Sequence, residues 1–141
     1  LGAPHWVPDA RGAIFGLTRD SGREELSLAT HEAVAFQTKE IISSLENDGI
    51  KVDSVRIDGG LTRNAFFSQI LSSVLELEVL CSKTVESTAL GAAYLAGIGA
   101  GEVSLQDVAK NWSPKAKYNP DSSYDMRRYD TWKEFLNRLI S

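Results

Sequence analysis

Two adjacent glycines lie where a strand pattern gives way to a helix pattern. An alternating apolar pattern ends at Ile57, Gly59 and Gly60 follow, and an apolar helical pattern begins a few residues later. Ligands collect at such junctions of open α/β sheets, because helix N-termini present unpaired N–H groups and partial positive charge. Glycine has no Cβ, so the backbone at this junction can come into contact with a flat or anionic ligand.

Asn64 is the second candidate for chemistry at this junction. It lies four residues after Gly60, in what we expect to be the first turn of the helix. There its amide could hydrogen-bond the edge of a base or a ribose, which suits the nucleoside end of a nucleotide. A tight turn alone would also explain the glycine pair. The spacing matches neither the three-glycine dinucleotide fingerprint nor the lysine-containing phosphate loop.

Few other residues could take part in metal binding or catalysis. His5 and His31 are the only histidines, and no cysteine or carboxylate cluster joins them at metal-ligand spacing, so we expect no metal site. Cys81 is the single cysteine, which excludes an internal disulfide and is typical of an apolar thiol on a strand. No nucleophile elbow or acid–base pair is evident, and no catalytic residue is assigned.

Composition sets the broad class of the chain. It has 141 residues, of which 43% are apolar and 24% charged, as in one folded domain or part of one. The net charge of −4 provides no domain-wide basic surface for nucleic acid. No apolar run approaches the roughly 18 to 20 residues of a membrane span. The N-terminus has no features of a secretory signal. Because it also lacks an initiator methionine and begins like the middle of a loop, we expect an excerpt from a longer protein.

The elements that would position the glycine pair alternate between helix and strand. A long helix is expected over residues 23–47, with a capping box at Ser21 and Glu24 and a left-handed stop at Gly49. The elements expected after it are a strand at 52–58, a largely buried helix at 63–75, a strand at 77–81, a helix rich in small residues from about Glu86, a short helix at 104–110 and a last helix at 123–140.

The two ends of the chain are less regular. Residues 1–20 are expected to form an extended connector with one short strand at 13–17. The segment around Pro114 and Pro120 is expected to be an irregular loop. In the last helix the aromatic residues Tyr129, Trp132 and Phe135 recur at helical spacing, which favours a role in the core.

This alternation predicts an α/β fold with strands made parallel by right-handed crossovers. Two or three strands form a very small sheet, whereas parallel sheets are normally buried on both faces. We therefore expect an exposed sheet edge that strands from preceding sequence would cover. No repeat or internal linker divides the 141 residues.

Three blocks, in this order, carry a resemblance to a known family. "LGAPHWVPDARGAIFGLTR", "RIDGGLTRN" and "ESTALGAAYLAG" together resemble the C-terminal part of the FGGY carbohydrate kinases. The resemblance covers roughly residues 2–101 and fades toward the C-terminus. Within the family these blocks are more similar to the members that act on glycerol than to those that act on xylulose or gluconate.

The resemblance implies an actin-like ATPase fold of the ribonuclease H-like type, with a polyol in the cleft and ATP bridging two lobes. This chain would be a partial C-terminal nucleotide-binding lobe whose first strands are missing. The divisions implied are a connector at 1–20, an α/β core at 21–101 and C-terminal helices at 102–141. The family's nucleotide-contacting positions correspond to Gly59, Gly60 and Asn64.

The family's catalytic base and polyol-binding residues lie upstream of this chain in the resemblance, so none is assigned here. ATP would be the cofactor, with Mg²⁺ bound mainly through residues outside the chain. The full-length protein would be cytoplasmic and homo-oligomeric, with neither nucleic acid nor membrane as a partner. His5 replaces the tyrosine usual in the family, and His31 replaces an apolar residue, which leaves the substrate within the family open.

Two other function classes compete with that of an ATP-dependent polyol kinase. One is a catalytically inactive actin-like relative that serves assembly or regulation, which an absent base upstream would favour. The other is a nicotinamide-binding domain. It is disfavoured because no glycine fingerprint follows an early strand and no acidic residue ends the next one.

Overall fold

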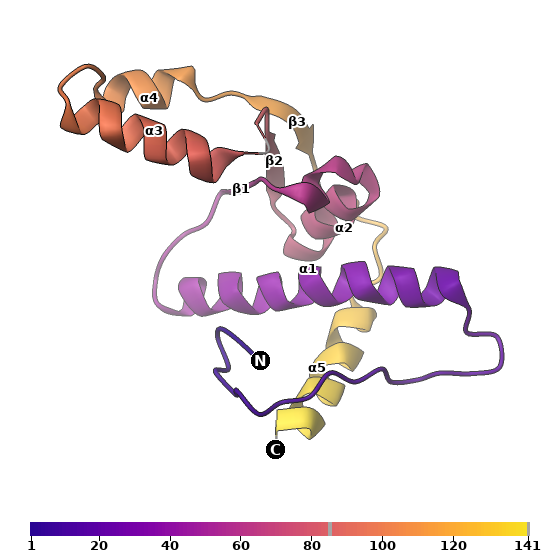
Figure 1. The fold of residues 1–141 in the computed structure, drawn as a ribbon. Helices are drawn as coiled ribbons and strands as arrows, with labels where there is room; N and C mark the ends of the chain where they lie inside the picture. The colour runs from indigo at the N-terminus through magenta and orange to yellow at the C-terminus, as the bar shows by residue number, and fades with distance from the viewer. Residues whose placement is uncertain (85, 141) are drawn as a thin grey trace.

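The computed structural model describes residues 1–84 and 86–140. It confirms the alternation of helices and strands, and therefore the α/β class (Figure 1). The elements in chain order are α1 (Arg23–Asn47), β1 (Ser54–Ile57), the 3-10 helix η1 (Gly60–Arg63), α2 (Ala65–Leu75), β2 (Glu78–Ser82), α3 (Ser87–Gly99), α4 (Leu105–Asn111), β3 (Pro114–Tyr118) and α5 (Arg127–Ile140).

The sheet has three strands in the order β1-β2-β3. β1 and β2 are parallel, with Val55 opposite Val79, and α2 connects them. β3 is antiparallel to β2, with Tyr118 opposite Val79. The sheet is thus mixed, and the expectation of a parallel sheet was correct only for β1 and β2. β1 is an edge strand, as the small strand number led us to expect.

Strand β3 was not predicted. The segment was expected to be an irregular loop within a region of helices at 102–141, because Pro114 cannot donate a ladder hydrogen bond. On an edge strand that loss is tolerated, and Pro114 opens the strand. Lys115 and Lys117 are exposed and alternate with less exposed residues, an edge-strand pattern that is visible in the sequence.

The core lies between α1, α2, α5 and one face of the sheet. Val74 of α2 and Val79 of β2 are completely buried. The buried residues of this cluster are Ala35, Phe36, Phe67, Ile70, Leu71, Val74, Leu75, Val79 and Tyr129. The amphipathic pattern of α2 is confirmed with one exception: Phe66 is 58% exposed.

The termini of α1 test two local predictions. Gly49 has φ +83°, which confirms the left-handed stop. The predicted N-terminal cap was wrong: the N-cap is Gly22, whose N–H donates to Glu25 Oε2 at 2.8 Å. Ser21 lies in the preceding turn instead, where its hydroxyl accepts the Thr18 N–H at 2.9 Å.

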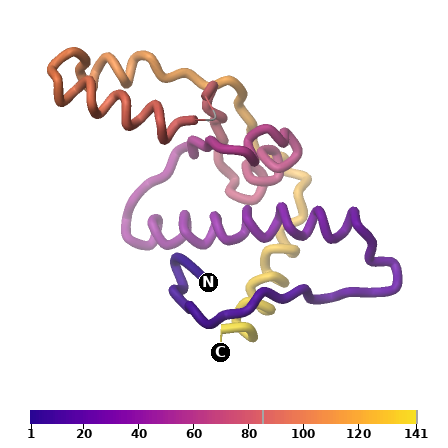
Figure 2. The backbone as a smooth tube through the Cα atoms, in the orientation of Figure 1, coloured from indigo at the N-terminus to yellow at the C-terminus, as the bar shows by residue number. Residues whose placement is uncertain are grey.

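Helices α3 and α4 lie side by side and project away from the rest of the chain (Figures 1 and 2). No residue of α3 is buried among the described residues. A Cβ added at Gly97 would lie 3.2 Å from Val103 Cγ2, whereas one at Gly91 would meet no atom within 4 Å. Within the part of the chain that the structure describes, no neighbour therefore packs closely against Gly91.

The N-terminal segment runs along α1 and past α5 (Figure 1). Residues 13–17 form no strand, contrary to expectation. Instead Phe15 stacks on Phe135 of α5, with ring centroids 4.5 Å apart and planes 5° apart. Trp132 packs against the core as predicted, and Tyr129 is buried in it. A groove of about 770 Å³ remains between this segment, α1 and α5.

Candidate functional site

The glycine pair forms a turn that its own backbone and one threonine hold in place. Gly59 has φ +88° and ψ −175°, a conformation almost restricted to glycine. Its carbonyl oxygen accepts from the Thr62 N–H at 3.2 Å and from the Thr62 hydroxyl at 2.7 Å. Glycine at position 59 is thus required by the backbone, whether or not a ligand binds.

Gly60 differs from its neighbour. Its φ lies outside the left-handed region, and a Cβ added there would meet no atom within 4 Å. Neither backbone conformation nor packing within the described chain requires glycine at this position. The turn therefore presents a stretch of bare backbone that faces open space, as close approach of a ligand would need.

Asn64 lies one residue before α2 rather than in its first turn, where we had expected it. It is the N-cap: its Oδ1 accepts from the N–H groups of Phe66 at 3.1 Å and Phe67 at 3.4 Å. The sequence interpretation missed this role. A strand, a glycine turn and an asparagine before an apolar helical run are a sufficient signal for it.

The amide nitrogen of Asn64 has a partner on α1. Asn64 Nδ2 lies 3.0 Å from His31 Nε2, and His31 Nδ1 lies 2.7 Å from the Ser27 carbonyl oxygen. Because an amide nitrogen carries two N–H groups, the second can donate to a ligand. No local sequence signal indicated His31, since 33 residues separate it from Asn64.

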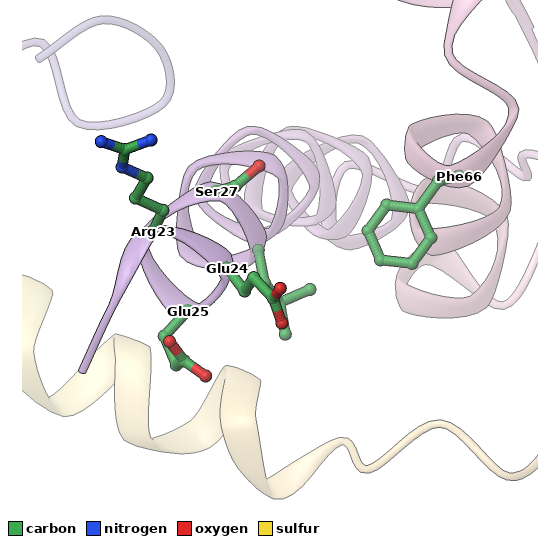
Figure 3. A pocket seen from close by; sticks show the side chains of 6 residues that line it. Arg23, Glu24, Glu25, Ser27 and Phe66 are labelled. Atoms are coloured by element: carbon green, nitrogen blue, oxygen red, sulfur yellow. The ribbon is translucent and has the colours of Figure 1, made fainter. Parts of the chain in front are cut away.

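A shallow hollow of about 520 Å³ adjoins this cap (Figure 3). Phe66 of α2 forms one wall, and the first turns of α1 form the other, with Glu24 and Glu25 among the lining residues. The pKa of Glu25 is lowered, mainly because its carboxylate accepts the Gly22 N–H. With Arg23 as the single cation in its lining, the hollow favours a neutral group over a phosphate.

The structure thus keeps Gly59, Gly60 and Asn64 together on one continuous turn at the carboxyl end of β1. Within residues 1–84 and 86–140, no group of three or more His, Cys, Asp or Glu side chains could hold a metal ion. Over the same residues, no helix has both the length and the apolar character needed to cross a bilayer.

Comparison with known proteins places these features in a family. The family model described as the C-terminal domain of the FGGY family of carbohydrate kinases matches residues 1–100. A glycerol kinase of Alteromonas mediterranea is 42% identical over 142 residues, covering 99% of this chain and 29% of the relative. A glycerol kinase of Haloferax volcanii is 40% identical over 143 residues, covering 99% of this chain and 28% of the relative.

Two solved kinase structures are also similar to this chain. Plasmodium falciparum glycerol kinase with ADP matches 99% of this chain and 29% of its own, with a TM-score of 0.78 and 33% identity. A gluconate kinase from Lactobacillus acidophilus has a TM-score of 0.82 over 99% of this chain and 29% of its own, and its 24% identity shows a shared fold alone. The chain therefore spans about 29% of the length of the relatives it matches.

Proposed function

The chain belongs to the FGGY family of carbohydrate kinases, and on that premise we propose that it supplies the adenine-nucleotide platform of a glycerol kinase. In this proposal the full-length enzyme transfers the γ-phosphoryl group of ATP to a hydroxyl of glycerol. The chain itself forms part of the C-terminal lobe. Its turn at Gly59 and Gly60 contacts the nucleoside end of ATP, and the remainder of the cleft comes from residues outside it.

The observation that carries this proposal is the open space at Gly60. The fold leaves the absence of a side chain at this position unexplained, since a Cβ there would meet no described atom within 4 Å. A planar base or ribose lying against the bare backbone provides the missing reason. Adjacent carboxylates in the hollow at Phe66 favour the neutral end of the nucleotide on this side, with the phosphates directed elsewhere.

Asn64 supplies the directional contact in the proposed site. Its Oδ1 is engaged by the start of α2 and one N–H by His31, so the remaining N–H is available to an acceptor on the base or the ribose. The position of the amide at the strand-to-helix junction supports this assignment. Gly59 contributes through the shape of the turn.

The chemistry of the proposed reaction is largely positioning. Phosphoryl transfer in line from ATP to a hydroxyl depends on alignment and on neutralising the charge of the phosphates, which Mg²⁺ supplies when bound. The described residues contain no cluster suited to a metal ion. From the family resemblance we assign the general base and the polyol contacts, and most of the Mg²⁺ contacts, to residues outside this chain, which binds and orients the nucleoside.

Several properties of the full-length protein follow from the family assignment as further proposals. Glycerol is preferred over xylulose or gluconate as substrate, because the glycerol kinases of Alteromonas and Haloferax are at least 40% identical to this chain. A homo-oligomer in the cytoplasm is consistent with the family resemblance, and the single buried thiol of Cys81 suits a reducing compartment.

The test is a kinetic comparison in the full-length enzyme. Gly60→Val should raise the KM for ATP about tenfold or more, equivalent to about 1.4 kcal/mol of binding, with little change in Tm. Gly12→Val is the matched control. Gly12 also has an ordinary φ and open space around it, but it lies in the N-terminal segment, far from Gly60 in the sequence. An unchanged KM in Gly60→Val would overturn the platform, and absence of turnover in the unmodified enzyme would favour an inactive actin-like relative.

A further inference from the structure

We propose that His31 of α1 is a positioning residue for the nucleotide site, because it fixes the amide of Asn64 so that one N–H points toward the nucleoside. This inference rests on the proposed function, since it assigns a supporting residue to the same site. His31 lies on a different element from the glycine turn and 33 residues before Asn64. Its role is thus separable by mutation from that of Gly60.

The hydrogen bonds of His31 define which nitrogen carries its proton. Nδ1 lies 2.7 Å from the carbonyl oxygen of Ser27, which can only accept, so Nδ1 is the donor. In the neutral ring Nε2 is then the acceptor, and it receives an N–H from Asn64 Nδ2 at 3.0 Å. The carbonyl group of one α1 residue therefore orients the ring that holds the Asn64 amide.

The opposite end of the same amide is fixed by α2. Asn64 Oδ1 accepts from the Phe66 N–H at 3.1 Å and the Phe67 N–H at 3.4 Å. Rotating the amide by half a turn would place its N–H groups against those two donors and its oxygen against the lone pair of His31 Nε2. The orientation is thus selected at both ends, and neither contact alone would exclude the rotated form as strongly.

Packing holds the imidazole in its place. Its ring centroid lies 6.1 Å from that of Phe66, nearly edge-on at 77°, and 5.9 Å from that of Phe67. The next residue, Glu32, is 4% exposed and is bound by Arg128 of α5. Residue 31 is therefore carried by a part of α1 that is anchored to α5, and its ring lies beside both aromatic rings.

The chemical consequence concerns the class of ligand atom that this site accepts. A fixed amide N–H pairs with a neutral acceptor, such as a ring nitrogen of a purine or a ribose oxygen. Loss of the His31 contact removes one of the two restraints on the amide and leaves the bonds from the α2 N–H groups, so the amide N–H is held toward the ligand less firmly. We therefore expect weaker nucleotide binding, with the phosphoryl-transfer step and the polyol site unaffected.

The experiment uses the full-length enzyme with His31→Phe, which keeps a flat ring but removes both nitrogens. The KM for ATP is expected to rise about threefold to tenfold, the range for one hydrogen bond, with kcat and the KM for glycerol unchanged. His31→Gln keeps an acceptor near the position of Nε2 and should restore most of the loss. Thr30→Val is the control, since Thr30 also bonds a carbonyl one turn back on α1, that of Leu26 at 2.8 Å.

Each outcome separates this inference from the proposed function. If Gly60→Val raises the KM for ATP but His31→Phe does not, the role of His31 is overturned and the platform stands. If neither variant changes the KM, both fail. A fall in kcat or an effect that His31→Gln does not relieve would show a structural role, which also overturns the inference.

A further variant pair keeps the test decisive if phenylalanine disturbs folding. His31→Leu removes the same acceptor with a smaller apolar side chain. In an Asn64→Asp background, which lacks the amide N–H, either substitution at residue 31 should have no additional effect on the KM for ATP. An additive increase in that background would mean that His31 acts by another route.

Discussion

Glu32 of α1 and Arg128 of α5 form a two-point ion pair, with 2.6 Å both from Nε to Oε1 and from Nη2 to Oε2. The Tyr124 hydroxyl also donates to Glu32 Oε1, at 2.7 Å. The Glu32 side chain is 6% exposed and that of Arg128 46% exposed. Because an isolated buried carboxylate is costly, this cluster ties the C-terminal helix to the helix that carries His31.

Removing the cation should test that connection. Arg128→Met is expected to lower the free energy of unfolding by about 2–3 kcal/mol, between the values for exposed and fully buried pairs, because Glu32 stays buried without its partner. Denaturant unfolding of the full-length protein measures the change. Arg127→Met is the matched control, since Arg127 is 87% exposed and pairs only locally with Asp125; equal effects of the two variants would refute the prediction.

The same cluster predicts how stability depends on pH. The pKa of Tyr124 is raised, first by burial and then by its hydrogen bond to Glu32. A raised pKa means that the unfolded chain loses the phenolic proton first, so stability is complete below the ordinary tyrosine pKa of about 10 and declines as pH rises above it.

Tyr124→Phe removes that titration. The free energy of unfolding, measured by circular dichroism at a series of alkaline pH values, should therefore fall less steeply with pH in the variant than in the unmodified protein. At neutral pH the variant is less stable by one hydrogen bond. Tyr94→Phe, in the projecting α3, serves as a control. Identical pH profiles for Tyr124→Phe and the unmodified protein would argue against the assignment.

The two glycines of the turn should respond differently to alanine. Gly59→Ala is expected to cost roughly 1–3 kcal/mol of stability, because φ +88° with ψ −175° is strained for any residue with a Cβ. Gly60→Ala should leave Tm almost unchanged, since its Cβ meets no described atom within 4 Å. Differential scanning calorimetry of both variants decides this. A larger loss at residue 60 than at 59 would contradict it.

Two substitutions of Asn64 separate its structural role from its proposed binding role. Asn64→Ala should lose about 1 kcal/mol of stability, because the α2 cap is removed. Asn64→Asp keeps a capping oxygen and should retain that stability, yet it lacks the N–H that the proposed nucleotide contact needs.

Both Asn64 variants are therefore expected to raise the KM for ATP, while only the alanine variant lowers Tm. Thermal unfolding and steady-state kinetics of the full-length enzyme provide the two readouts. A normal KM in Asn64→Asp would restrict Asn64 to its cap.

Local features of the chain were predictable from sequence because their causes are local. Helix α1 occupies residues 23–47 as expected, and Gly49 ends it through its own backbone conformation. The glycine pair was correctly placed between a strand and a helix, and the family could be inferred from three ordered blocks. Even the missed cap at Asn64 follows from its immediate neighbours.

Contacts between distant residues were decided by the tertiary structure. Pairing of β3 with β2 depends on which edge α4 delivers the chain to, and no pattern within residues 114–118 specifies its partner or direction. The bond from His31 to Asn64 spans 33 residues, and that from Glu32 to Arg128 spans 96. Sequence periodicity reports which face of an element is apolar, whereas packing determines which elements, and hence which side chains, meet.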